Sequence, residues 1–169
     1  MKSISLSPEE LNENVFRLIS KDWFLLTAGT TDRGFNTMTA SWGGLGHLWN
    51  MDVSFVFVRP QRHTWKFMEK NQLYTMSFFS ENYRDALKYC GTHSGRDVDK
   101  TAETGLTPWE PGPGAVAFQE ARLVMVCRKL YYQDLDPGTM LDDSIPSLYP
   151  EKGFHRVYIG EITETFLRE

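Results

Sequence analysis

The run MDVSFVFVR at positions 51–59 constrains the fold more than any other stretch of the chain. Its apolar side chains fall on both faces of a strand, Phe55 and Phe57 on one and Val56 and Val58 on the other. A sheet with one face in water would alternate apolar and polar residues instead. We therefore expect this strand to be covered on both sides, by helices or by a second copy of the chain.

Other stretches have the composition of short strands, with polar turns and helix-prone segments between them. Strands are expected at residues 23–29, 35–42, 73–79, 115–135 and 155–167. The first two form a hairpin around the turn TTDRG, and the long fourth stretch holds either two strands or one bent strand. The glycine-rich stretch before Trp49 is interpreted as a loop. Six or seven strands with short helices between them predict a mainly β fold, a small closed β-barrel with helical decoration.

The N-terminal residues 1–22 predict a helical segment packed on this barrel. Ser7 suits the N-cap, Pro8 the first helical position and Glu10 the acidic position of a capping box. Apolar residues then recur at helical spacing, at Leu11, Val15, Leu18 and Ile19. The chain has 169 residues, which predicts a single domain over residues 1–169.

Composition excludes several classes of protein. Aromatic residues make up 14% of the chain, more than a plain core requires, and the net charge is −4. Two cysteines are too few for a disulfide scaffold and favour a reducing, cytoplasmic location. The mild acidity argues against nucleic acid as a partner. The start MKSISLSPEE lacks the apolar core of a signal peptide, and no apolar run approaches the roughly 20 residues of a membrane span, so no membrane association is expected.

Signatures of hydrolytic catalysis are missing from the sequence, which has no nucleophile elbow, no HExxH and no P-loop. The four histidines are not at metal-ligand spacing, so no metal site is expected. One segment does suggest ligand binding. In RPQRHT, Arg59 ends an apolar strand, and Arg62 and Thr64 follow at the start of a short helix. Two guanidiniums, a hydroxyl and free helix amides suit a phosphate, although a solvated basic turn is the alternative interpretation.

Two further segments could contribute to such a site. THSGRDVDK, residues 92–100, places basic side chains beside Gly95, and either an anion site or a charged surface helix fits this pattern. NTMTASWGGLG, residues 36–46, offers main-chain amides and hydroxyls to the polar edge of a planar heterocycle. Trp42 or Trp49 could cover one face of such a ring.

Together and in this order, these segments resemble the flavin reductase-like, FMN-binding split-barrel family, specifically its flavoredoxin branch. The resemblance rests on NTMTASWGGLG, FVFVRPQRHT, SGRDVDK before a Gly-Leu, and FHRVYIGEI. It covers the chain from Trp23 to the C-terminus. It implies a Greek-key-like split β-barrel and a homodimer that holds FMN at the subunit interface.

The resemblance also assigns residues. It implies that the main chain of the strand-to-loop segment contacts the flavin pyrimidine edge and ribityl chain, through Thr37, Met38, Thr39, Ala40, Ser41 and Trp42. It places the phosphate against Arg59 and Thr64, with Arg62 and His63 close by. A segment closing over the phosphate end contains Ser94, Gly95, Arg96 and Lys100. Ser77 stands where relatives often carry Asn, and His155 matches a histidine near the flavin and nicotinamide. No residue matches a required general acid or base.

The implied function is a flavin reductase, an oxidoreductase that passes electrons from NADH, NADPH or a protein donor through bound FMN. The acceptor would be free flavin, a ferric complex or a partner protein. This suits the absence of a catalytic acid or base, because the cofactor carries hydride chemistry and the protein supplies alignment and electrostatics. Two alternatives remain open. One is an FMN electron carrier without its own nicotinamide site, and the other is a non-enzymatic β-barrel that binds a ligand or nucleic acid.

Overall fold

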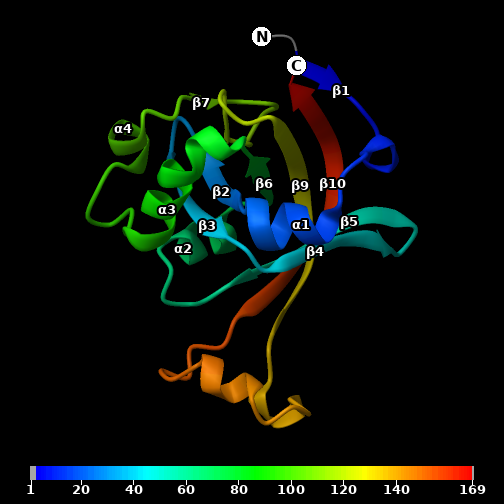
Figure 1. Ribbon diagram of the computed structural model, residues 1–169, viewed down its shortest axis with the longest axis vertical. Coiled ribbons are helices and arrows are strands. Elements are labelled where there is room, and N and C mark those ends of the chain that lie inside the picture. The colour runs from blue at the N-terminus through cyan, green and yellow to red at the C-terminus, as the bar shows by residue number, and fades with distance from the viewer. Residues whose placement is uncertain (1–2, 169) are drawn as a thin grey trace.

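A computed structural model describes residues 3–168 of the chain (Figure 1). The strands are β1 (Ser3–Ser5), β2 (Phe24–Thr30), β3 (Gly34–Ala40), β4 (Gly43–Leu48), β5 (Met51–Val58), β6 (Leu73–Phe78), β7 (Pro108–Trp109), β8 (Ala117–Phe118), β9 (Leu123–Asp134) and β10 (Arg156–Arg168). The α-helices are α1 (Val15–Arg17), α2 (Thr64–Lys70), α3 (Arg84–Thr92) and α4 (Lys100–Thr104). Short 3₁₀ turns occupy Pro8–Glu10, Glu81–Tyr83, Pro137–Thr139 and Ile145–Leu148, and Leu18–Asp22 forms a π-helical turn. The predicted mainly β fold is confirmed.

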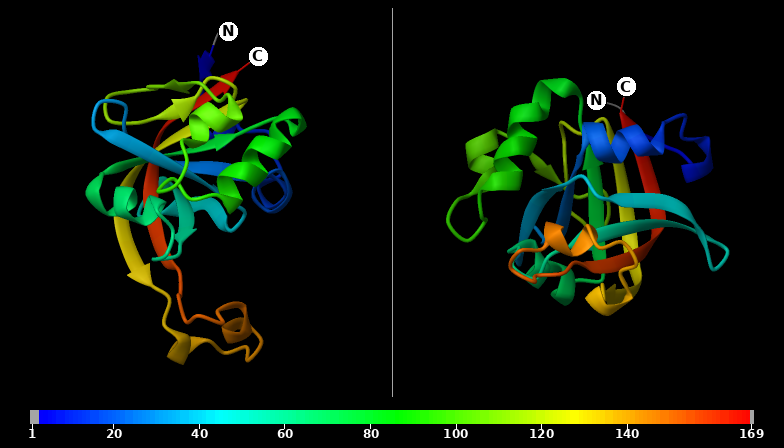
Figure 2. Two further views of the ribbon diagram at one scale, coloured as in Figure 1. Left: turned by 90° about the vertical axis from the view of Figure 1, so that its left-hand side faces the viewer. Right: turned by 60° about the horizontal axis from the view of Figure 1, so that its bottom comes forward.

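One antiparallel sheet forms the body of the molecule, with strand order β3-β2-β6-β9-β10-β5-β4 and β1 added beside β10. Its two outermost strands, β3 and β4, follow one another in the chain with only Ser41 and Trp42 between them. The sheet must therefore curl back on itself, as the two views in Figure 2 show. No strand pairing joins β3 to β4 within residues 3–168, so the barrel is split at this seam. The connection from β5 to β6 crosses β10 and β9, which gives the Greek-key-like character.

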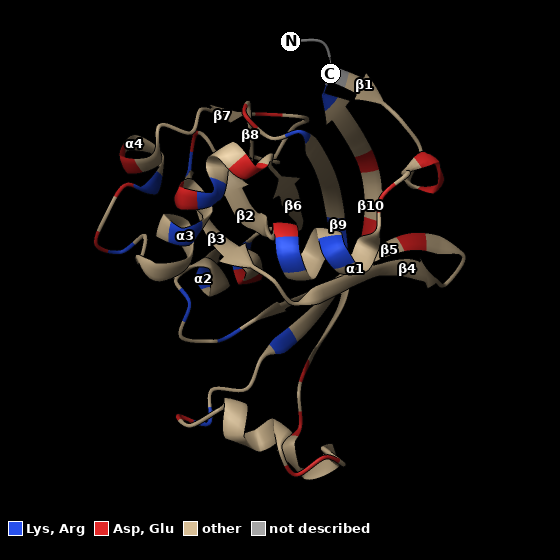
Figure 3. Cartoon of the chain, in the orientation of Figure 1, with Lys and Arg blue, Asp and Glu red and all other residues tan. Residues whose placement is uncertain are grey.

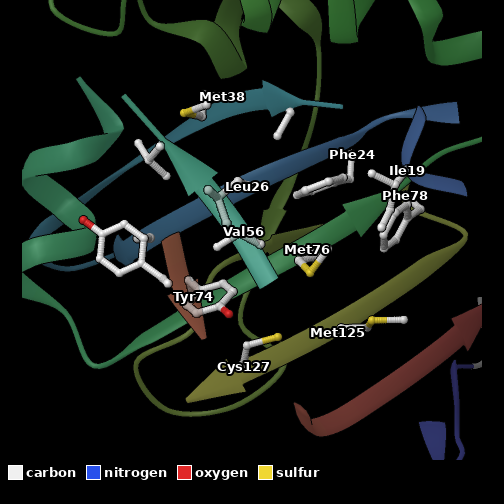
Figure 4. Close-up of a cluster of buried hydrophobic side chains, with 14 of the residues drawn as sticks. Ile19, Phe24, Leu26, Met38, Val56, Tyr74, Met76, Phe78, Met125 and Cys127 are labelled. Carbon is white, nitrogen blue, oxygen red and sulfur yellow. The ribbon is translucent and has the colours of Figure 1, made fainter. Parts of the chain in front are cut away.

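The interior of the barrel is apolar and closely packed. Alternate residues of the strands point inward, so Leu26, Val56, Met76 and Met125 share one cluster (Figure 4). These four side chains have no exposed surface. Burial of this kind stabilises the fold by about 1.5–3 kcal/mol for each large aliphatic side chain.

Part of the outer face is covered by a second layer, as the two-faced apolar strands predict. Leu87 and Cys90 of α3 pack with Leu25 and Val124 from the outward side of β2 and β9. The short pair β7–β8 adds Phe118 to the same cluster. On the outward face of β5, Val53 is buried but Phe55 and Phe57 are only half-buried, which leaves this end of the strand without a full cover among the described residues.

The predicted continuous N-terminal helix is wrong. The 3₁₀ turn Pro8–Glu10 ends at Leu11, whose backbone is extended. The Asn14 side chain then accepts a hydrogen bond from the Arg17 amide at 3.0 Å and caps a new helix, α1. An N-cap residue requires extended backbone and offers the chain a local alternative to the helix, so Asn14 interrupts the apolar periodicity.

The glycine-rich stretch before Trp49 is also not a loop, because it forms strand β4 and pairs with β5. A Cβ on Gly43 would lie 2.6 Å from the Phe55 carbonyl oxygen, so only glycine lets the two strands approach there. Trp49 and Asn50 both have positive φ, 54° and 58°, and form the two-residue turn of this hairpin. The 115–135 stretch contains two strands, β8 and the long β9, with shifts in the β9–β10 register.

No helix among the described residues is long and apolar enough to cross a membrane.

Candidate functional site

A cavity of about 390 Å³ opens at the seam of the barrel, where the chain passes from β3 to β4. We call it the seam cavity. Its lining residues come from three segments far apart in the sequence: Met38, Thr39, Ala40, Ser41, Trp42, Phe57, Arg59, Gln61, Arg62, Glu151 and His155. Its volume lies within the range of small-molecule sites, roughly 300–1,000 Å³. The structure thus brings together the Met38–Trp42 segment, two predicted phosphate-binding arginines and His155.

The wall formed by β3 offers main-chain hydrogen-bonding groups. β3 is an edge strand, so every second amide and carbonyl faces away from β2 and has no strand partner. The Thr37 carbonyl oxygen is on this free side, since it accepts a hydrogen bond from the Lys100 Nζ at 2.7 Å. The period of two places the Thr39 main chain on the same side. The Thr39 main chain, which lines the seam cavity, is therefore on the side of β3 that has no strand partner among the described residues.

Two arginines, Arg59 and Arg62, line the seam cavity together with one acidic residue, Glu151, and no ion pair joins them to it among the described residues. Arg59 Nη2 donates to the Leu148 carbonyl oxygen at 2.7 Å, and Arg62 Nη1 donates to the Gly91 carbonyl oxygen at 2.8 Å. Neither guanidinium forms an ion pair within residues 3–168, although most other arginines do. Burial and the neighbouring Arg59 lower the pKa of Arg62. Each guanidinium retains further N–H donors, which suits a phosphate or carboxylate.

His155 closes the other side of the seam cavity between aromatic rings. Its ring centroid lies 5.0 Å from that of Trp42 and 6.4 Å from that of Phe57, the latter at right angles. Its Nδ1 is 2.8 Å from the Tyr149 hydroxyl. Burial, with a smaller contribution from Arg59, lowers the pKa of His155 to about 4. The imidazole is therefore neutral near pH 7.

A second cavity of about 480 Å³ lies beside the first, between β3 and the segment that leads into α4. We call it the loop cavity. It is lined by Thr31, Gly34, Phe35, Asn36, Thr37, Gly95, Arg96, Asp97, Val98, Asp99, Lys100 and Thr101. Lys100 Nζ donates to the Thr37 and Cys90 carbonyl oxygens at 2.7 and 2.8 Å. Lys100 is buried, and this burial lowers its pKa to about 8. Its ammonium thus ties α4 to β3 and α3.

Basic and acidic residues are interspersed around α2, α3 and α4 (Figure 3), and one contact joins the two basic segments there. Arg96 Nε donates to His63 Nδ1 at 3.3 Å, which connects the SGRDVDK segment to RPQRHT. Burial and the charge of Arg96 lower the pKa of His63. The sequence segments predicted to meet an anion are therefore adjacent, but they line two cavities and not one.

The remaining predicted site residues lie outside the linings of both cavities. The buried Thr64 Oγ1 accepts a hydrogen bond from Asn36 Nδ2 at 2.8 Å, behind the cavity wall. Ser94 Oγ accepts from the Arg96 amide at 3.2 Å and shapes the loop before α4. Ser77 is completely buried on β6, beside Leu25 and Val124 in the sheet, and its hydroxyl has no hydrogen-bond partner among residues 3–168.

Sequence reasoning missed several residues of the seam cavity. Glu151 comes from the segment between β9 and β10, which projects from the barrel and returns to it (Figures 1 and 2). Tyr149, from the same segment, is not part of the lining, but its hydroxyl lies 2.8 Å from His155 Nδ1. That segment has no periodicity or motif that would single them out. Phe57 and Gln61 flank the Arg59 turn, and their proximity to it was the only available signal. Within residues 3–168, no cluster of three or more metal-ligating side chains is present.

Comparison with known families identifies the class to which this fold and cavity belong. The family model described as a flavin reductase like domain matches residues 16–169. The chain therefore belongs to the flavin reductase-like family, and the predicted resemblance is confirmed. A comparison with curated proteins finds no match.

Solved structures with the same fold include two flavoredoxins. The flavoredoxin of Desulfovibrio vulgaris (Miyazaki F) is 23% identical with a TM-score of 0.68, over 100% of this chain and 78% of that one. The flavoredoxin from Methanosarcina acetivorans is 22% identical with a TM-score of 0.68, over 97% and 77%. Nitrilotriacetate monooxygenase component B from Bacillus cereus is 17% identical with a TM-score of 0.69, over 100% and 83%. At these identities the similarity establishes the fold, and the ligand must be argued from the site.

Proposed function

We propose that this chain is an FMN-dependent oxidoreductase that binds the flavin in the seam cavity. The observation that carries the proposal is the pair Arg59 and Arg62, which lack acidic partners among the described residues and face the free edge of β3. A ligand that suits both features has an anionic group at one end and a planar polar heterocycle at the other. FMN, with its phosphate and its pyrimidine edge, has both.

The residues present fit this cofactor. Arg59 and Arg62 would hold the phosphate through their remaining N–H donors, and Arg96 lies beside His63. Main-chain groups of the Thr39–Trp42 segment would meet the pyrimidine edge, because Thr39 lies on the free side of β3 and Ser41 and Trp42 follow the end of the strand at the cavity. Trp42 is 45% exposed at the cavity and offers a ring face to a planar ligand.

FMN supplies the redox chemistry when bound, accepting hydride and passing on electrons. This chain's own residues orient the ring and set its surroundings. Donors directed at the pyrimidine edge stabilise negative charge that develops there, and the nearby guanidiniums act in the same direction. We expect NADH or NADPH as the donor, and free flavin, a ferric complex or a partner protein as the acceptor.

We further propose that the active form is a homodimer in the cytoplasm. The outward side chains Phe55, Phe57 and Ile159 are half-buried, and Trp49 and Tyr131 are exposed at 52% and 44%. They belong to β5, β10, β9 and the β4–β5 turn, which are adjacent in the sheet. A contiguous apolar surface of this kind is typical of an interface. The two cysteines are free and buried, which suits a reducing compartment.

The first test measures FMN affinity by fluorescence titration. Arg59→Ala should weaken binding by about 1.5–3 kcal/mol, the range for a hydrogen bond to a charged group. Arg128→Ala is the matched control, because that arginine pairs with Glu161 on β10 and not with the seam cavity. Wild-type affinity in the Arg59 variant would place the phosphate elsewhere.

A second test separates an enzyme from an electron carrier. The FMN-loaded protein is mixed rapidly with NADH or NADPH without oxygen, and the flavin absorbance is followed. Bleaching by either nucleotide supports the reductase. Flavin that stays oxidised until a partner reductase is added would instead assign the electron-carrier role.

A further inference from the structure

We propose that Tyr149 is a positioning residue that holds His155 as its Nε2–H tautomer, so that the imidazole donates a hydrogen bond into the seam cavity. The group it meets must be an acceptor, such as a carbonyl oxygen or an unprotonated ring nitrogen of a planar heterocycle. That this heterocycle is a flavin or its nicotinamide donor rests on the proposed function. The tautomer itself rests only on the geometry of the protein.

The burial of Tyr149 fixes the direction of the hydrogen bond between its hydroxyl and His155. The Tyr149 hydroxyl lies 2.8 Å from His155 Nδ1, and Tyr149 is 5% exposed. Within residues 3–168 this hydroxyl has no other hydrogen-bond partner, so its proton can be satisfied only by Nδ1. If Nδ1 carried a proton instead, the phenol proton would be left buried and unpaired, which costs about 1–3 kcal/mol for such a group. Nδ1 is therefore the acceptor, and the ring proton is on Nε2.

Contacts from both the barrel and its own segment hold Tyr149 in place. Its ring packs 4.7 Å from Phe154 and lies beneath the Arg59 guanidinium, whose Cζ is 4.9 Å from the ring centroid. Arg59 also donates to the carbonyl oxygen of the preceding residue, Leu148. The Tyr149 amide donates to the Pro146 carbonyl oxygen at 3.0 Å. The tyrosine is thus fixed from both the barrel and its own segment, although that segment projects from the molecule.

The Nε2 edge of the His155 imidazole is free of protein hydrogen bonds among the described residues. Trp42 and Phe57 pack around the ring, and Nδ1 is occupied by Tyr149. Nε2 has no partner among the described residues, and His155 lines the seam cavity. A ligand in that cavity therefore meets an N–H donor.

The protonation states of His155 and Tyr149 agree with this arrangement. The ionisable groups around His155 are Arg59 and Arg62 from the β5–α2 turn and Tyr149 and Glu151 from the β9–β10 segment. Burial and Arg59 lower the pKa of His155, while burial raises the pKa of Tyr149 against the opposing effect of Arg59. Both side chains are neutral near pH 7. His155 therefore orients a ligand as a neutral donor and does not supply a proton.

The decisive experiment is ¹⁵N NMR of the histidine side chains in the flavin-free protein, with His155 assigned from the spectrum of His155→Gln. We expect a single Nε2–H tautomer in the wild type. In Tyr149→Phe we expect both tautomers and a proton affinity of His155 raised about threefold to tenfold, the effect of losing one neutral hydrogen bond. Tyr89→Phe is the matched control, because Tyr89 stacks on His93 without a hydroxyl bond to its ring.

A wild-type His155 protonated on Nδ1 would overturn the proposal, as would a Tyr149→Phe spectrum and titration identical to the wild type. The wild-type spectrum decides even if the variant does not fold. FMN titration of the same samples separates this proposal from the proposed function. Tyr149→Phe should bind FMN about twofold to tenfold more weakly, again the value of one neutral hydrogen bond. Wild-type protein that binds no FMN but shows the Nε2–H tautomer would remove the proposed function and leave the positioning role intact.

Discussion

The seam cavity and the loop cavity each contain two basic side chains, but these cations have different hydrogen-bond partners. Arg59 and Arg62 each donate one hydrogen bond to a main-chain carbonyl and keep further donors directed outward. Lys100 has three N–H donors, and two of them are bound to Thr37 and Cys90. A basic side chain near a ligand site can therefore bind the ligand only with those N–H donors that are not already bonded to main-chain carbonyl oxygens. We therefore assign the seam cavity to binding and the ammonium of the loop cavity to architecture.

The largest expected effect comes from removing this ammonium. Lys100→Met should lower the free energy of unfolding by about 2–4 kcal/mol, because two buried carbonyl oxygens lose their donor. Methionine fills a similar volume and introduces no charge, so the loss reports the missing hydrogen bonds. Urea denaturation measures it, with Lys66→Met on the exposed side of α2 as the control. The control should change stability by less than about 0.5 kcal/mol.

FMN binding by Lys100→Met tests whether Lys100 is structural or belongs to the binding site. FMN affinity should fall less in Lys100→Met than in Arg59→Ala. A variant of unchanged stability that no longer binds FMN would move Lys100 into the binding site and merge the two cavities into one.

The sequence was most informative where local rules and tertiary structure agree. Apolar residues on both faces of 51–59 predict a strand, and β5 is that strand, with Val56 and Val58 buried in the core and Phe55 and Phe57 half-buried on the outward face. Arg59 and Arg62 were predicted as a pair because a proline turn at the end of an apolar strand leaves both near one edge of the sheet. Thr39, Ala40 and Ser41 were found because small polar residues interrupt an otherwise apolar strand, and the family resemblance extended the segment to Thr37–Trp42.

The rest depends on contacts that no local pattern encodes. The Lys100 ammonium on α4 binds carbonyl oxygens of β3 and α3, and the β3 carbonyl is far from it in the sequence. The sequence around Lys100 therefore cannot show that its ammonium is already bound. Tyr149 belongs to a segment without periodicity, and its role arises only where that segment returns to the barrel. The glycines of β4 were interpreted as a loop because the close approach to Phe55 that requires Gly43 cannot be seen in one strand alone.

A smaller effect should come from the lining of the loop cavity, at Gly95. A Cβ there would lie 1.9 Å from Asn36 Oδ1, and the Asn36 amide is held by Thr64. Gly95→Ala should therefore destabilise the protein by about 1–3 kcal/mol through overpacking. Gly91→Ala is the comparison variant, since its Cβ would meet Thr39 at 3.3 Å and requires only a slight adjustment.

A double-mutant cycle shows whether the cost arises at Asn36. The penalty of Gly95→Ala should shrink when it is measured in an Asn36→Ala background, because the obstructing amide is then absent. Equal penalties in both backgrounds would mean that the backbone of the loop, and not this contact, requires glycine.

The smallest effect is a pH dependence that belongs to the seam cavity alone. The pKa of His155 is lowered from its ordinary value of 6.5 to about 4 by burial and Arg59. As the pH falls from 6.5 towards 4, His155 becomes protonated in the unfolded chain but stays neutral in the folded protein, so the free energy of unfolding decreases over this range. Because the ring is only partly buried, we expect a loss of about 1–2 kcal/mol.

The measurement is urea denaturation at several pH values for the wild type and His155→Gln, and the difference between the two isolates His155 from His63, whose pKa is also lowered. The wild type should lose more stability than His155→Gln between pH 6.5 and 4. Lys100→Met should keep the wild-type slope there, because the pKa of Lys100, about 8, leaves its ammonium charged throughout this range. Parallel curves for the wild type and His155→Gln would contradict the neutral, buried imidazole.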